Sequence, residues 1–190
     1  CPKHFPKNVN KFWKDKFWFP GNELKLDIPC LTISGDGIDN CQLPAIVKVR
    51  NIDDPNGGII GALEYVRHWK PILNLKNQDI IWNNKKSECV WRGSPTGINQ
   101  NSSGPPEKWA NLRLVFCHKW YKIYNIGITK TGINGILNTW NTKYVKNSMN
   151  IEELLKYKYI ISIPGNDKDT GLNWKLASNS LVLMAKPKIE

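Results

Sequence analysis

The feature that most constrains the fold is an alternation of helix-like and strand-like segments along the second half of the sequence. Residues 107–120 carry apolar side chains at helical spacing. Asn150 stands three residues before Glu153, which is the pattern of a capping box at the start of the next helix. Strand-like runs follow at residues 121–129, 158–163 and 181–184, and a further short helix is predicted at 172–179. Such alternation favours a parallel sheet with right-handed crossovers, whose ligands gather at the carboxyl ends of the strands.

The first half of the chain has a different pattern, which predicts a separate lobe. Its short apolar runs are separated by Gly, Pro, Asn and Asp and are typical of strands, at residues 28–34, 44–50, 62–66 and 88–93. Residues 1–27 mix Lys with Phe and Trp, which indicates a terminal arm held by aromatic anchors, although nucleic acid also binds such mixtures. We therefore expect an α/β chain with a smaller strand-containing lobe at 1–86 and a Rossmann-like lobe at 87–190.

The charge balance indicates the class of partner. Lys and Arg total 27 against 16 for Asp and Glu, a net charge of +11, which favours nucleic acid, an anionic membrane surface or a phosphorylated small molecule. No apolar run approaches the roughly 18 residues of a membrane helix, so we expect no membrane span. The five cysteines form no CxxC pair and no His stands at zinc-finger spacing, so we expect no structural zinc site.

The first segment whose residues suit ligand binding is WRGSPTG, residues 91–97, where a predicted strand ends in a turn. Glycine permits a close approach of the backbone to a ligand, the hydroxyls of Ser94 and Thr96 donate hydrogen bonds, and Arg92 offers a planar fork for phosphate oxygens. The alternative is structural: a polar turn after a buried strand, with Arg92 paired inside the fold.

The second segment is GNDKDTGLNWK, residues 165–175, a polar loop that leads into the predicted helix. Exposed N–H groups at such a point favour an anion. Thr170 is a candidate N-cap and Lys175 a candidate countercharge, although a solvated Lys on a helix face is equally ordinary. Neither GxxxxGK[ST] nor GxGxxG occurs, so no motif supports an NTPase or a dinucleotide oxidoreductase.

The two segments resemble the motifs of glycosyltransferase family ninety, because WRGSPTG precedes GNDKDTGLNWK in the chain and LASNSLVLMAKP follows. That family includes lipopolysaccharide-modifying and capsule-associated transferases and protein O-glucosyltransferases. The resemblance is strongest over residues 154–187, clear at 82–97 and fainter over 44–69. It implies a GT-B architecture, with the donor held by the 87–190 lobe and the acceptor side formed by the 1–86 lobe. It also implies inverting transfer from a UDP-sugar, commonly UDP-glucose or UDP-xylose, to a hydroxyl of a glycan or protein, with no cofactor and no metal.

The resemblance also assigns candidate donor-binding residues. They are Arg92, Gly93, Ser94 and Thr96 of the first motif, Arg113 on the helix that follows, and Gly165, Asn166, Gly171 and Lys175 of the second motif. One position departs from the family pattern: Asn173 stands where a Lys or Arg is usual, so Lys175 or Lys168 would have to supply the phosphate countercharge. The family pattern also continues past Glu190, so the donor lobe is expected to be incomplete here.

An inverting transferase needs a base, which in this family is an acidic residue of the N-terminal lobe. Asp36, in the turn SGDGIDN, is the candidate and Asp39 the alternative. For Asp36 a purely structural role, as a turn-forming Asp before Gly, is an equally good explanation. Two other functions stay open. One is a family member that has lost transfer, because of Asn173, and the other is a basic nucleic-acid-binding module. We expect no nucleic acid, because the sharpest motifs lie on Gly-bearing turns beside strands; the sugar, the acceptor and the compartment are left open.

Overall fold

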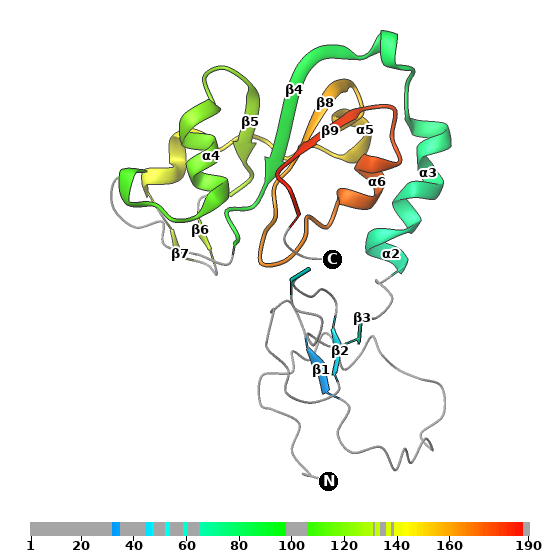
Figure 1. Cartoon of the computed structure of the whole chain (residues 1–190). Coiled ribbons are helices and arrows are strands. Elements are labelled where there is room, and N and C mark those ends of the chain that lie inside the picture. Colours follow the sequence, from blue (N-terminus) through cyan, green and yellow to red (C-terminus); the bar gives the residue numbers. More distant parts are fainter. Residues whose placement is uncertain are drawn as a thin grey trace. The chain divides into compact units, whose positions relative to one another are not determined.

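A computed structural model of the chain describes residues 32–34, 45–47, 52–53, 59–60, 65–97, 106–130, 132–133, 136–137 and 139–187. The chain divides into two compact units, one formed by Cys1–Leu63 with Pro187–Glu190 and the other by Glu64–Lys186. In the first unit, three short parallel strands pair in the order β1-β2-β3. They are β1 Thr32–Ser34, β2 Ala45–Val47 and β3 Ile59–Ile60 (Figure 1).

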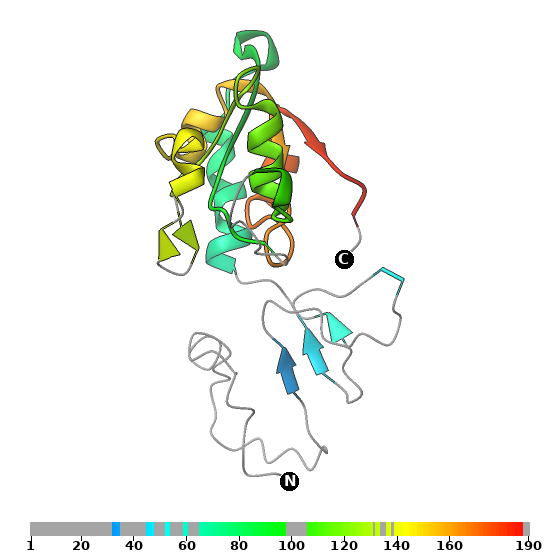
Figure 2. The ribbon, with the colours of Figure 1, turned by 90° about the vertical axis from the view of Figure 1, so that its left-hand side faces the viewer.

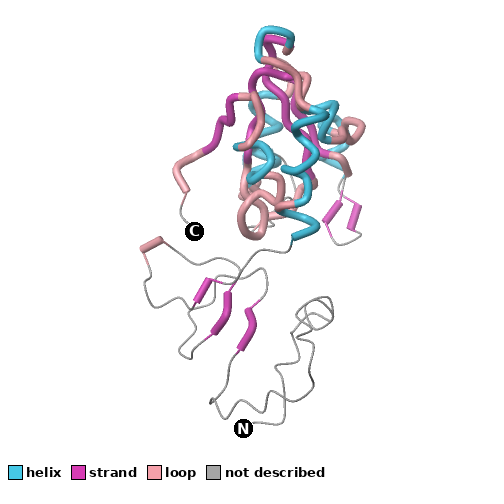
Figure 3. Tube along the Cα trace, turned by 90° about the vertical axis from the view of Figure 1, so that its right-hand side faces the viewer, coloured by secondary structure: helices cyan, strands magenta, loops and turns pink. Residues whose placement is uncertain are grey.

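The second unit is built on a four-stranded sheet in the order β5-β4-β8-β9, in which every neighbouring pair is parallel. Its strands are β4 Lys86–Gly93, β5 Asn125–Ile128, β8 Tyr157–Ser162 and β9 Leu181–Met184. Helices alternate with these strands along the chain (Figure 3). This confirms the α/β class and the parallel sheet that the alternating pattern predicts.

Short helices and one small antiparallel pair complete this unit. The helices are α2 Tyr65–His68, α3 Lys70–Gln78, α4 Leu112–Trp120, α5 Ile151–Leu154 and α6 Leu172–Leu176. The 3-10 turns are η1 Trp82–Asn84, η2 Pro106–Lys108 and η3 Thr139–Tyr144, and the antiparallel pair is β6 Gly132–Ile133 with β7 Ile136–Leu137. The helix α4 lies on one side of β4, and α3 and α6 lie on the other (Figure 1); α4 is nearest the viewer in Figure 2.

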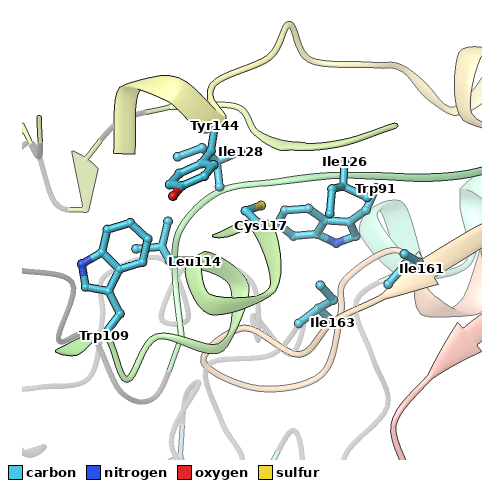
Figure 4. Packing of buried hydrophobic residues seen from close by; sticks show 9 residues of the cluster. All are labelled: Trp91, Trp109, Leu114, Cys117, Ile126, Ile128, Tyr144, Ile161 and Ile163. Atoms are coloured by element: carbon cyan, nitrogen blue, oxygen red, sulfur yellow. The ribbon is translucent and has the colours of Figure 1, made fainter. Parts of the chain in front are cut away.

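The core is divided by the sheet, because successive strand residues point to opposite faces. On β4 and β8, Trp91 and Ile161 belong to the cluster on the α4 side, whereas Val90 and Ile160 belong to the cluster with α3, α5 and α6. Figure 4 shows the nine side chains of the α4-side cluster, which are Trp91, Trp109, Leu114, Cys117, Ile126, Ile128, Tyr144, Ile161 and Ile163. Both faces of the inner strands are therefore buried, as in other parallel sheets.

The predicted capping box is confirmed at α5. The backbone N–H of Glu153 donates to Asn150 Oδ1 over 2.8 Å, and that of Asn150 donates to Glu153 Oε2 over 2.7 Å. The helix predicted at 107–120 begins only at Leu112, because Asn111 is its N-cap and accepts from the N–H of Leu114 over 3.1 Å. The following strand begins at Asn125 and not at residue 121, since residues 121–124 continue as turns from the end of α4.

The strand predicted at 62–66 is wrong at its end, where Tyr65 and Val66 begin α2. Tyr65 and Val66 are exposed, and the buried side chain of α2 is His68. A five-residue apolar run is too short for its periodicity to distinguish a strand from a helix. Here the segment is helical, with His68 as its buried residue.

The second compact unit begins at Glu64, and the division into lobes at 1–86 and 87–190 stays a prediction. Leu75 of α3 packs in the same cluster as Trp174 of α6, so the segment that precedes β4 belongs to the core of this unit. The predicted acceptor-side and donor-side roles of the two lobes stay predictions.

Candidate functional site

The two predicted motifs meet at one edge of the four-stranded sheet. The strands β4 and β8 are parallel neighbours, so the turn 94–97 and the loop 163–171 both leave the sheet at its carboxyl edge. A Cβ built on Gly97 would lie 3.9 Å from the carbonyl oxygen of Gly165, which places the two loops in contact. This edge is where parallel α/β sheets bind ligands.

Arg113 of α4 joins the two loops. Its Nη1 donates to the carbonyl oxygen of Ser94 and to Thr96 Oγ1, each over 3.0 Å. Its Nη2 donates to Ile163 O over 2.9 Å and its Nε to Pro164 O over 3.1 Å. Four hydrogen bonds to protein acceptors thus make this side chain a clamp between the end of β8 and the turn after β4.

The electrostatic environment of this clamp is mixed. Burial lowers the pKa of the Arg113 guanidinium, and the negative charges of Asp169 and Asp167 partly oppose this effect. The guanidinium also lies 5.8 Å from the centre of the Trp91 ring, within the range of a cation–π contact.

The hydroxyls of Ser94 and Thr96 lie 3.0 Å apart and form a hydrogen-bonded pair. The pair has two hydroxyl hydrogens, and the contact between them uses one. Because Arg113 is a donor, it takes an acceptor position on Thr96 and leaves the second hydroxyl hydrogen unused. The predicted hydroxyl pair can therefore donate one hydrogen bond to a ligand.

Asn111 positions the first turn, and the sequence analysis did not single it out. Its side chain is fully buried; the Nδ2 donates to Pro95 O over 3.0 Å while the Oδ1 caps α4. The available signal was an Asn directly before the apolar residues of α4, which is typical of an N-cap.

The predicted glycines are explained first by close contacts within the protein. A Cβ on Gly93 would lie 2.6 Å from Cζ2 of Trp91, and one on Gly171 would lie 2.8 Å from Nε1 of Trp174. A Cβ on Gly165 would come within 3.0 Å of the Arg113 guanidinium. Their role in letting a ligand approach the backbone stays a prediction.

Lys175 is buried, with 6% of its surface exposed. Its ammonium pairs with Oδ2 of Asp169 and donates to Ile161 O over 3.1 Å. It is therefore not a solvated Lys, and its predicted contact with a ligand stays a prediction. Asp169, which the sequence analysis missed, also accepts from Ser162 Oγ over 2.8 Å and from the N–H of Gly171 over 2.9 Å, whereas Thr170 makes no side-chain cap.

The loop tip places polar groups at the same edge. Lys168 Nζ donates to Asn173 Oδ1 over 2.9 Å. The Lys168 ammonium thus lies beside position 173, where the family pattern has a Lys or Arg. Asn166 Oδ1 is buried and has no hydrogen-bond partner among the residues that the structure describes. A buried acceptor of this kind is satisfied by a donor from water or a ligand.

Arg92 is held inside the fold, as the structural alternative has it, although by hydrogen bonds and not by a carboxylate. It donates to Asn125 O and Asn125 Oδ1, each over 2.8 Å, to Trp91 O over 2.9 Å and to Asn147 O over 3.1 Å. Its predicted contact with a ligand stays a prediction. The candidate bases Asp36 and Asp39 lie outside the described residues.

The described residues offer neither a metal site nor a membrane span. No group of three or more His, Cys, Asp or Glu side chains gathers there in a way that would hold a metal ion. Within the same residues, no helix combines the length and the apolar character needed to cross a membrane.

A parallel sheet flanked by helices, with polar loops at the carboxyl ends of its two central strands, defines the class of Rossmann-like ligand-binding proteins. Over 157 residues the chain is 30% identical to the O-glucosyltransferase LpsA of Dichelobacter nodosus. These residues are 82% of this chain and 43% of LpsA, so the chain matches less than half of that relative's length. No family model matches the chain. The similarity suggests a glycosyltransferase family, and the parallel sheet is compatible with a Rossmann-like glycosyltransferase fold.

Proposed function

We propose that the protein is a glycosyltransferase of family ninety, of GT-B architecture, that transfers a sugar from a UDP-sugar to a hydroxyl of a glycan or protein acceptor. The observation that carries the proposal is the joining of both motifs at one sheet edge by Arg113. The similarity to a protein named as an O-glucosyltransferase supports the same class of reaction. Glucose and xylose are the sugars that the family resemblance favours.

Within this proposal the residues of the edge divide into two groups. The hydroxyl pair Ser94 and Thr96 and the tip residue Asn166 contact the donor, since they retain polar groups for it at the edge. Arg113 and the Asp169–Lys175 pair shape the loops, because their polar atoms are bonded to the protein. Lys168 supplies the phosphate countercharge that Asn173 lacks, which argues against a family member that has lost transfer.

The chemistry is an inverting displacement. The acceptor oxygen attacks the anomeric carbon, the bond from that carbon to the phosphate oxygen breaks, and UDP leaves with the electron pair. A base takes the proton of the acceptor hydroxyl. Asp36 has this role in the proposal and Asp39 is the alternative; no metal and no cofactor take part.

Thermal unfolding of the full-length protein with a panel of UDP-sugars tests the proposal. A ligand at about one hundred times its Kd stabilises the folded state by about 2.7 kcal/mol, so UDP and one UDP-sugar should raise the Tm. EDTA should leave this shift and the transfer activity unchanged. Absence of a shift with every UDP-sugar, together with a shift on adding an oligonucleotide, would favour the nucleic-acid-binding alternative.

The base is tested separately with Asp36→Asn. This substitution should spare UDP-sugar binding and abolish transfer, because a base acts only in the chemical step. Retained turnover would move the role to Asp39 or to another acidic residue.

A further inference from the structure

Asp169 lies at the end of the loop that connects β8 to α6, and it ties four parts of this region together. Its carboxylate accepts from the Ser162 hydroxyl at the end of β8, from the N–H of Gly171 and from the Lys175 ammonium of α6. Its carbonyl oxygen accepts from the N–H of Leu172 over 3.0 Å. We propose that Asp169 is the positioning residue of this loop and holds it in the form that receives the donor, an inference that rests on the proposed function.

The loop is fixed at both ends by charged side chains. At its start, Arg113 donates to the carbonyl oxygens of Ile163 and Pro164. At its end, Asp169 anchors the backbone of Gly171. Residues 165–168 form the span between these anchors, closed by a hydrogen bond of 2.9 Å from the N–H of Gly165 to Asp167 O. In this proposal the tip lies between two anchors, Arg113 and Asp169, and takes its place from both.

Asp169 also determines what Lys175 does. A buried ammonium needs a paired carboxylate, because an uncompensated buried charge is strongly destabilising. The carboxylate of Asp169 compensates the charge of the Lys175 ammonium, which also donates to Ile161 O in β8. The pair of Asp169 and Lys175 therefore adds rigidity and no net charge to the edge.

A second buried pair of the same chemistry provides a matched control. Lys85 donates to Asp79 Oδ1 and to Leu155 O, each over 2.5 Å, and the carboxylate of Asp79 also accepts from the N–H groups of Ile80 and Asn179. Lys85 directly precedes β4, and Leu155 and Asn179 stand two residues before β8 and β9, so this pair lies at the amino edge of the sheet. It combines an Asp, a Lys and bound backbone N–H groups, away from the proposed site.

The experiment compares Asp169→Asn with Asp79→Asn in the full-length protein. Both variants should lower the Tm, because each leaves a buried Lys without its partner. Only Asp169→Asn should weaken UDP binding, by roughly tenfold or more in titration calorimetry well below the Tm. In the free protein, Asp169→Asn should also speed hydrogen exchange of the amides in residues 165–172, and Asp79→Asn should leave that exchange unchanged.

A double variant, Asp169→Asn with Lys175→Met, keeps the test decisive if the single variant does not fold. It leaves no buried charge unpaired, so the Tm should recover. UDP affinity should stay reduced, because an amide offers one acceptor oxygen where the carboxylate serves both Ser162 and Gly171. Wild-type affinity in the double variant, or an equal loss of affinity in Asp79→Asn, overturns the positioning role.

The proposed function fails in a distinguishable way. If the wild-type protein does not bind UDP, the donor proposal is wrong and the ligand part of this inference is lost with it. If the wild-type protein binds UDP and Asp169→Asn binds it equally well, the donor proposal survives and this inference alone is wrong. Unchanged hydrogen exchange over residues 165–172 in Asp169→Asn refutes the anchoring of the loop in either case.

Discussion

Substitution of Arg113 by Met tests whether this side chain is a structural clamp or only a ligand contact. Methionine retains most of the length and apolar character of the side chain and removes every donor. The clamp predicts a loss of stability together with a loss of UDP affinity, since both loops lose their connection. A pure ligand contact predicts weaker binding with unchanged stability.

The expected magnitude follows from the four hydrogen bonds of Arg113. The bond to Pro164 O is exposed and water replaces it, so its loss costs little. The other three, to Ser94 O, Thr96 Oγ1 and Ile163 O, are partly buried. At about 1 kcal/mol for each partly buried bond, Arg113→Met should lower the free energy of unfolding by about 3 kcal/mol.

Urea unfolding at 25 °C, followed by tryptophan fluorescence, measures this difference. Lys119→Met is the matched control: it removes another cation from α4, at an exposed position, and should change the free energy of unfolding by less than about 0.5 kcal/mol. Arg113→Lys should fall between the wild type and Arg113→Met, because an ammonium cannot reach both loops with the fork geometry. A free energy for Arg113→Met within about 0.5 kcal/mol of the wild type would refute the clamp.

Three further predictions concern charge and burial. Burial raises the pKa of the Asp169 carboxyl, but the Lys175 ammonium and the other hydrogen bonds to the carboxylate outweigh this and leave the pKa lowered. The contribution of Asp169 to stability is therefore complete above about pH 4 and is lost as the pH falls through the lower pKa of the folded state, so the free energies of unfolding of the wild type and Asp169→Asn, measured in urea, should converge in acid. Burial raises the pKa of the Cys117 thiol to about 12, so iodoacetamide at pH 8 should label it only after unfolding, as mass spectrometry of the peptides would show; labelling in the native state would contradict its place in the core. Asn173→Lys adds a cation beside Lys168, so UDP affinity should rise and become more salt-dependent while uridine affinity changes little, and an unaltered UDP titration would place the phosphates elsewhere.

The sequence by itself determined the framework of the second unit. Val90 and Trp91, like Ile160 and Ile161, are consecutive apolar residues that a parallel sheet buries on its two faces, so the strands could be located from composition. The capping box at α5 was equally readable, because its two partners are three residues apart in the chain. The meeting of the two motif loops was not determined by the sequence alone, because it depends on β4 and β8 being neighbours in the sheet.

The limits of helices and strands were predicted less well where the signal was short. The prediction for α4 included five residues too many at its start, because the N-cap at Asn111 was not recognised in the sequence. The run at 62–66 has a composition suited to a strand, and it became helical at Tyr65 because His68 and Leu75 are the buried positions of α2 and α3.

Only the tertiary structure decided what the charged side chains do. Arg92, Arg113 and Lys175 were all predicted to face a ligand, and each is bonded to oxygen atoms of its own chain. For Arg113 the acceptor at Ile163 lies 50 residues away in sequence. The reach and flexibility of a Lys or Arg side chain allow many partners, and the sequence does not state which oxygens come within reach. Those oxygens are backbone carbonyls, the side-chain oxygens of Thr96 and Asn125 and the carboxylate of Asp169, and their relative positions exist only once the sheet has assembled.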